Sequence, residues 1–296
     1  MHITLVVTDT KRKNLFFVTE DRVAYPLVEA VRLAQKGELP GVYAVQGKGG
    51  SFLRTKPPVP KDQELECLSI SAPELFSFIQ GTGHAKSTRA LDRYLETYLS
   101  VLEGGPSITP IGNPKVLKEE IKKRFIPHGA HILSAATQFD INPYLLGAIL
   151  IDEIARALPF EPVLDAISIH ILGRNTSAGV AQVKTDTAND LIKKNVYNPN
   201  PRDIRLPFER MTNTARAHLY TYIVQPKHSI FFAAAFIRFV IDFWSSHSDL
   251  SNRPEIIGTL YHQGYGEPKR SPQSNARGEQ VANQLFPLAK SWLTEA

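Results

Sequence analysis

Two adjacent carboxyl groups, Asp152 and Glu153, come at the end of a long apolar segment of the chain. Residues 144–151 are nearly all apolar, which predicts a helix buried on most of its faces. Leu145, Ile149 and Glu153 lie along one i, i+4 row of that helix. A carboxyl group at the end of an apolar row loses solvation, which favours its neutral form and raises its pKa. Glu153 is therefore predicted to be a general acid that protonates a leaving oxygen, as glycosidic cleavage requires.

Asp152 is expected to serve a different purpose from its neighbour. It lies about 100° round the helix from Glu153, so we expect it to point elsewhere and to pair with Arg156 at i+4. The alternative is that Glu153 itself is a helix-surface acid paired with Arg156 or with a lysine.

A turn rich in small residues follows in the segment GRNTSAGVAQVKTDTANDL. Ser177, Ala178 and Gly179 permit a tight turn and a close approach of the backbone to a ligand. The amide of Gln182 can both donate and accept hydrogen bonds, and Thr185 opens a helix. The alternative for Gln182 is that it only satisfies backbone groups beside the loop.

The third element is the segment GTLYHQGYGEP, in which a helix closes with Tyr261 and His262 before two glycines. Tyr261 and His262 are candidate site residues, with a core tyrosine whose hydroxyl is satisfied and a structural histidine as the alternatives. His170, on an apolar segment, is expected in the core.

Together, the segments LLGAILIDEIAR, SAGVAQVKTDTA and TLYHQGYG resemble, in order and spacing, the goose-type lysozyme and soluble lytic transglycosylase superfamily. The resemblance covers residues from about 115 to 267. It implies cleavage of the β-1,4 glycosidic bond of peptidoglycan, with Glu153 as general acid and base. The substrate-binding residues that it implies are Ser177, Gly179, Gln182, Tyr261 and His262. The chain departs from the family pattern where Asp-Glu-Ile replaces Glu-Ser, and where His262 replaces an asparagine.

The number of carboxylates bears on the mechanism. Hydrolytic glycosidases generally need a second carboxylate, whereas the resemblance to lytic transglycosylases implies one glutamate and ring closure by the muramyl 6-hydroxyl. No acidic residue lies between Asp165 and Asp186, and Glu161 and Asp165 are the possible second groups. We favour the single-glutamate mechanism, with lysozyme-type hydrolysis as the alternative.

The elements that position these residues predict an α+β fold. Residues 1–78 are expected to form a small α+β domain, residues 79–112 a helical linker, and residues 113–296 a mainly α-helical, lysozyme-like catalytic domain. The first domain resembles a small family of unknown function through the segments AQKGE, VYAVQGKGG and SFLRTKPPVPKDQELECL. That resemblance implies no chemistry, and we expect a docking or adaptor role.

Proline and asparagine signals predict where several helices begin. Asn113 with Pro114, and Asn142 with Pro143, are expected to cap helices that start at the prolines. The remaining helices are expected at 128–139, 185–194, 206–223, 229–245, 253–260 and 278–294.

Composition excludes several classes of protein. Of 296 residues, 43% are hydrophobic and 21% are charged, with a net charge of +5 and a pI near 9.2, which suits a polyanionic partner. Basic and aromatic residues do not interleave on a platform, so no nucleic-acid partner is expected. No apolar run reaches the roughly 18 residues of a membrane span. Neither paired metal-ligand spacing nor a nucleotide-binding loop is present, so we expect no metal and no cofactor.

Delivery is the remaining question that the sequence raises. The first residues show no signal peptide pattern, so the chain is expected to be made in the cytoplasm and to act at the bacterial cell wall after lysis or injection. A phage lysin, a phage-tail-like component or an injected antibacterial effector would satisfy this, with a carrier protein bound through residues 1–78. The alternative function is a catalytically inactive lysozyme-like module that binds cell wall or serves as a structural adaptor.

Overall fold

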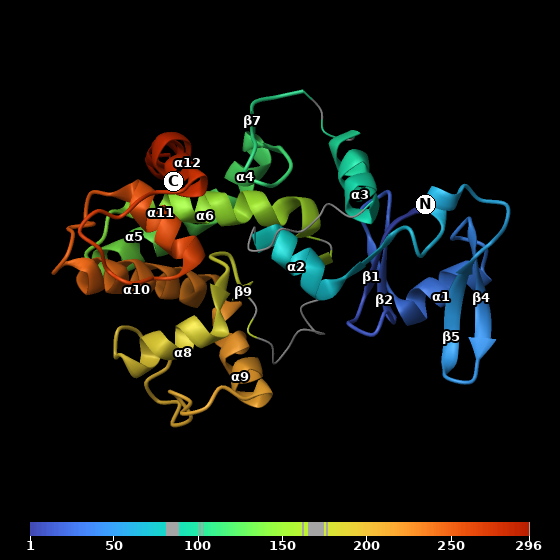
Figure 1. The fold of residues 1–296 in the computed structure, drawn as a ribbon, viewed down its shortest axis with the longest axis horizontal. Coiled ribbons are helices and arrows are strands. Elements are labelled where there is room, and N and C mark those ends of the chain that lie inside the picture. The colour runs from blue at the N-terminus through green and yellow to red at the C-terminus, as the bar shows by residue number, and fades with distance from the viewer. Residues whose placement is uncertain are drawn as a thin grey trace. The chain divides into compact units, whose positions relative to one another are not determined.

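The computed structural model describes residues 1–80, 89–100, 102, 104–161, 163–164, 175 and 177–295. The contacts divide the chain into two compact units. The first comprises Met1–Gly105, Gly112–Lys115 and Arg156–His170, and the second comprises Pro106–Ile111, Val116–Ala155 and Ile171–Ala296. A small sheet region precedes a mostly helical region (Figure 1), so the predicted α+β fold class is confirmed. The predicted domain boundaries at 78 and 112 stay predictions, and His170 lies outside the described residues.

The first unit is built on a four-stranded sheet with the order β3-β2-β1-β6. Strand β1 is antiparallel to β2 and parallel to β6, and β4 and β5 form a separate hairpin. The bounds are β1 (Ile3–Thr8), β2 (Asn14–Thr19), β3 (Ala24–Pro26), α1 (Leu27–Gln35), β4 (Val42–Gly47), β5 (Gly50–Thr55), β6 (Ser69–Ser71), α2 (Ala72–Gln80) and α3 (Arg89–Ser100), with 3-10 turns at Lys61–Gln63 and Leu158–Phe160.

Every residue of β1 is buried. A strand with one face exposed to solvent would instead alternate between buried and exposed residues. Helix α1 packs on β2 and on the β4–β5 hairpin, and α3 packs on β1 and β6. One continuous cluster joins Val6 and Phe17 of the sheet to Leu33 of α1 and Leu53 of the hairpin. The sheet is therefore covered by α1, which lies between β3 and β6 in the chain, and by α3, which follows the sheet.

Residues that follow the acid-bearing helix in sequence belong to the first unit. Phe160 stacks on Tyr94 of α3, with ring centroids 5.6 Å apart, and meets Phe78 of α2 edge-on at 5.8 Å. The Tyr94 hydroxyl donates to the carbonyl of Pro159, and the guanidinium of Arg22 donates to that of Leu158. Burial raises the pKa of Tyr94 to about 12. The first unit therefore depends on a segment distant from its sheet in the sequence.

The second unit is mainly helical. Its bounds are β7 (Ser107–Ile108), β8 (Val116–Leu117), α4 (Lys118–Phe125), α5 (Gly129–Phe139), α6 (Pro143–Ala157), β9 (Ser177–Ala178), β10 (Val183–Lys184), α8 (Thr185–Lys193), α9 (Asn213–Ile223), α10 (Pro226–Trp244), α11 (Pro254–Gln263), α12 (Ala276–Gln280) and α13 (Phe286–Leu293), with a 3-10 turn at Ile126–His128 and a π-helical turn at Val281–Leu285. The last two residues of α6 are assigned to the first unit by their contacts.

Helix α10 forms the centre of this unit. It packs against α5, α8, α9 and α11, and Figure 1 shows it beside α11. Twelve of its residues are buried, including the three consecutive alanines at 233–235. Small side chains at these positions let neighbouring helices approach closely.

Three predicted helix boundaries differ from the structure. Val116 and Leu117 pair with β7, so α4 begins at Lys118 and the predicted cap at Asn113 and Pro114 is wrong. Helix α9 begins at Asn213 rather than at 206, because the Thr212 hydroxyl accepts a hydrogen bond from the amide of Ala215. The last predicted helix is three consecutive elements, with the π-helical turn in the middle.

The predicted helix cap at Asn142 is confirmed, since its side chain accepts a hydrogen bond from the amide of Tyr144 at 2.9 Å.

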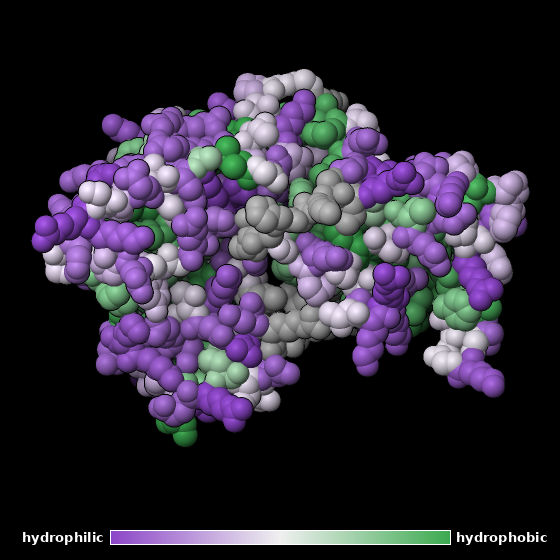
Figure 2. Space-filling view, in the orientation of Figure 1, coloured by the Kyte–Doolittle hydropathy of each residue, from purple (hydrophilic) through white to green (hydrophobic). Residues whose placement is uncertain are grey.

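The visible surface of the protein is mainly hydrophilic, with small scattered hydrophobic patches (Figure 2). None of the helices within the described ranges has the length and hydrophobicity needed to cross a membrane.

Candidate functional site

The two adjacent acids of α6 converge on one cation, Arg277. Its Nε donates to Oδ2 of Asp152 at 2.5 Å, and its Nη2 donates to Oε1 of Glu153 at 2.6 Å. All three residues are buried, with 3%, 7% and 6% of Asp152, Glu153 and Arg277 exposed. The expectation that Asp152 points away from the partner of Glu153 is wrong, because the broad guanidinium reaches both carboxylates.

One guanidinium binds both carboxylates of this cluster. Burial lowers the pKa of Arg277, but the carboxylates of Asp152 and Glu153 raise it by more, so the net shift is upward and the arginine stays charged. Asp152 and Glu153 are therefore coupled through one shared guanidinium.

His262 completes the cluster around the arginine. Nη1 of Arg277 lies 2.5 Å from Nδ1 of His262. Because a guanidinium only donates hydrogen bonds, Nδ1 is the acceptor, and the neutral ring carries its proton on Nε2. The imidazole is therefore held with a known tautomer, and protonation at Nδ1 would break its contact with Arg277.

The conformation of the turn after β9 depends on Gly179 and Gln182. Gly179 has φ +69°, and a Cβ there would lie 2.2 Å from the carbonyl oxygen of Ile223 and 2.4 Å from Oγ of Ser229, so only glycine is accommodated. The side-chain amide of Gln182 donates to the carbonyl of Gly179 at 2.9 Å. Ser177, in β9, is buried. Gln182 thus holds the shape of the turn.

Tyr261 links this turn to the acids. Its hydroxyl donates to the carbonyl of Ala181 at 2.7 Å. Burial raises the pKa of Tyr261 well above its ordinary value, and the charge of Glu153 raises it further, as expected for a phenol near that carboxylate. The structure therefore brings together Glu153, Tyr261, His262 and the turn that contains Gly179 and Gln182.

Arg277 was not identified from the sequence. It lies at the start of α12, whose N-cap residue Asn275 accepts a hydrogen bond from the amide of Gly278 at 2.8 Å. A Cβ at Gly278 would lie 2.0 Å from the carbonyl oxygen of Glu255 and 2.2 Å from Oγ1 of Thr259, so α12 is in backbone contact with α11. This contact fixes the depth at which Arg277 enters the cluster.

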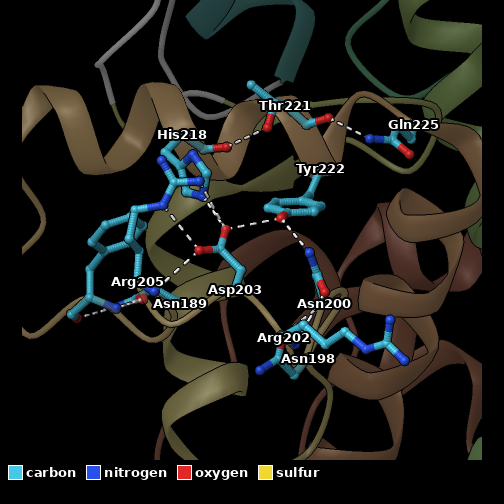
Figure 3. Close-up of polar contacts among 11 residues, drawn as sticks. Asn189, Asn198, Asn200, Arg202, Asp203, Arg205, His218, Thr221, Tyr222 and Gln225 are labelled. Carbon is cyan, nitrogen blue, oxygen red and sulfur yellow. Dashed lines mark hydrogen bonds and ion pairs between the residues drawn. The ribbon is translucent and has the colours of Figure 1, made fainter.

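A second polar cluster is centred on Asp203, which follows α8 and precedes α9 in the sequence, and includes His218 and Tyr222 of α9 (Figure 3). Its carboxylate accepts hydrogen bonds from Arg205, from Nε2 of His218 at 2.5 Å and from the hydroxyl of Tyr222 at 3.0 Å. Asn200 in turn donates to that hydroxyl. The hydrogen bonds from Arg205 are the largest cause of the lowered pKa of Asp203. We interpret this network as the structural tie that holds the connection onto α9.

Within the described ranges, no group of three or more His, Cys, Asp or Glu residues is arranged to hold a metal ion. The chemistry available at the site is that of the two acids, the arginine, the histidine and the phenol.

The chain is similar in sequence to a protein whose name states an activity. It is 29% identical over 157 residues to the peptidoglycan muramidase Tse3 of Pseudomonas aeruginosa. The match covers 51% of this chain and 36% of the relative, so it spans about a third of that protein's length. No family model matches the chain.

Proposed function

We propose that this protein cleaves the β-1,4 glycosidic bond of bacterial peptidoglycan, with Glu153 as the catalytic acid and base. The observation that supports this most directly is the position of Glu153. It is buried on α6 beside Tyr261, whose hydroxyl binds the turn that contains Gly179 and Gln182. The similarity to a peptidoglycan muramidase agrees with the same substrate.

The arginine determines how such an acid would work. A guanidinium at 2.6 Å favours the ionised form of Glu153, which suits a base rather than an acid. Because Asp152 shares the same guanidinium, the pair can hold one proton without leaving Arg277 uncompensated. In this proposal the shared proton reaches Glu153 when the glycosidic oxygen is bound, and Asp152 retains the ion pair.

The structure suggests a different second carboxylate from those that the sequence suggested. Asp152 adjoins Glu153, whereas Glu161 belongs to the first unit and Asp165 lies outside the described residues. In this proposal Asp152 acts through Arg277 rather than on the sugar, so the single-glutamate route remains the favoured one. The products separate the two routes, since transglycosylation gives anhydro-muropeptides and hydrolysis gives reducing ends.

The experiment is digestion of purified peptidoglycan, with mass spectrometry of the soluble fragments. Glu153→Gln is expected to abolish fragment release and to preserve the fold, because Arg277 and Asp152 then form a charge-balanced pair. Glu120→Gln, at an exposed carboxyl on α4, is the matched control and is expected to remain active. Full activity of the Glu153→Gln protein would show that the acid is assigned wrongly.

A catalytically inactive module is the second candidate, and the ion pair between Glu153 and Arg277 is the observation that favours it. Such a module would bind peptidoglycan, release no fragments and bind equally well after Glu153→Gln. Attachment to a carrier through residues 1–78, and action at the cell wall after lysis or injection, stay proposals that a test of secretion or delivery would address.

A further inference from the structure

Aromatic side chains extend from the candidate site to the surface along α10. Phe236, Phe239 and Phe243 are spaced i, i+3 and i+7, so they share one face of the helix. Phe236 meets Tyr261 edge-on, with ring centroids 5.4 Å apart, and lies 6.5 Å from Tyr265. Ring contacts therefore run without interruption from the tyrosine beside Glu153 to Tyr265.

The outer end of this row consists of two exposed rings. Phe243 is 41% exposed and Tyr265 is 36% exposed, and their centroids are 5.6 Å apart with planes at 81°. Phe239 supports both, because it stacks on Phe243 at 5.6 Å and meets Tyr265 edge-on at 5.3 Å. Each exposed ring is thus held in place by an aromatic neighbour.

The backbone around Tyr265 is also restrained. Its neighbours Gly264 and Gly266 have φ values of +92° and +55°, the left-handed region that favours glycine. Nε1 of Trp244 donates to the carbonyl of Tyr265 at 2.8 Å. Little ordering of this loop would be required when a ligand binds.

Charged side chains lie near the aromatic row, over Phe239 and on the helix that carries Phe243. The ammonium of Lys194 lies 5.6 Å from the ring centroid of Phe239 and is hydrogen bonded to Asp190 at 2.7 Å. Arg238 and Asp242 form an ion pair on the same helix as Phe243. An apolar surface with hydrogen-bonding groups at its edge is complementary to a pyranose ring, whose C–H face is apolar and whose rim carries hydroxyl and amide groups.

We infer that Phe243 and Tyr265 form a sugar-stacking subsite for the peptidoglycan strand, continuous with the site around Glu153. This inference rests on the proposed function and adds a place where a sugar ring away from the scissile bond is bound. Two partly exposed rings present far less surface than the roughly 1,000 Å² of a specific protein interface, so a single sugar ring suits them better than a protein partner.

The test measures binding separately from cleavage. In the Glu153→Gln protein, sedimentation with purified peptidoglycan gives an apparent Kd without turnover. Tyr265→Leu and Phe243→Leu, which keep apolar bulk but remove a ring, are each expected to weaken binding by about 2- to 10-fold. Tyr265→Phe keeps the ring and is expected to bind like its parent, as is Tyr43→Leu at a tyrosine 41% exposed in the first unit.

The outcomes distinguish the two ideas. If the wild type releases fragments and the Glu153→Gln protein binds peptidoglycan, but neither leucine variant weakens binding, the subsite is refuted and the proposed function stands. If the wild type neither cleaves nor binds peptidoglycan, both are refuted. Phe243→Leu changes a side chain at the end of a helix and keeps the inference testable if Tyr265→Leu does not fold.

Discussion

Replacing Arg277 with methionine removes a cation that contacts both Asp152 and Glu153, two buried acids that are adjacent in the sequence. Breaking a buried ion pair by removing one partner typically costs about 3–5 kcal/mol. Because two buried carboxylates each lose a contact with this cation, we expect a loss at the upper end of that range, about 5 kcal/mol, at neutral pH. A loss of this size is comparable with the whole stability of many domains.

The assay is urea denaturation of the full chain, compared in two backgrounds. With Asp152 and Glu153 intact, Arg277→Met is expected to lower the free energy of unfolding strongly. In a background with Asp152→Asn and Glu153→Gln, the arginine no longer faces the charges of these two acids, so Arg277→Met is expected to cost much less. The difference between the two backgrounds measures the coupling between the arginine and the acids.

Arg238→Met is the matched control, since Arg238 pairs with the exposed carboxylate of Asp242 on α10. This change is expected to cost less than about 1 kcal/mol, as is usual for surface ion pairs. The reasoning is refuted if Arg277→Met costs no more than the control, or if its effect is the same in both backgrounds.

Three further predictions concern other described contacts. Gly179→Ala places a Cβ against the carbonyl of Ile223 and is expected to cost about 2–4 kcal/mol in thermal or urea unfolding and to abolish cleavage of peptidoglycan. Tyr94→Phe leaves the carbonyl of Pro159 without its donor and is expected to cost about 1–3 kcal/mol at pH 7. The folded pKa of Tyr94 is about 12, so the wild type is expected to lose stability above pH 10, and the variant to lose less. Burial and then Lys227 lower the pKa of His228, so its contribution to stability is present above about pH 6.5 and lost as the pH falls below that value, and His228→Gln is expected to flatten the change in Tm between pH 7.5 and 5.

The acid-bearing helix was predictable because its signals are local. The apolar run at 144–151 and the pair Asn142 and Pro143 predicted α6 and its first residue, and the structure has both. Two adjacent acids in an apolar helix also imply that a buried cation must exist. A buried cationic partner is therefore predictable, but which of the 34 lysines and arginines of the chain supplies it is not.

The features that were missed depend on contacts between distant segments. Arg277 lies in the segment PQSNARGEQ, which has no hydrophobic period, and it is placed by the contact of Gly278 with α11. The strand pair of β7 and β8 displaced the predicted helix start at Pro114, because pairing with another strand outweighed a favourable local cap. The exposure of Phe243 on α10 was also not predictable, since periodicity identifies a helix face but not what covers it.

The ion pairs of Arg277 join residues that are 124 and 125 positions apart in the sequence. Closing so long a loop is slow, so the pocket is assembled late during folding, only after α11 and α12 dock onto α6. Until then Glu153 is an ordinary hydrated carboxylate with neither its dry surroundings nor its partner. Under the proposed function, a newly made or partly unfolded molecule would therefore not cleave the glycan, and activity would appear only when folding is complete.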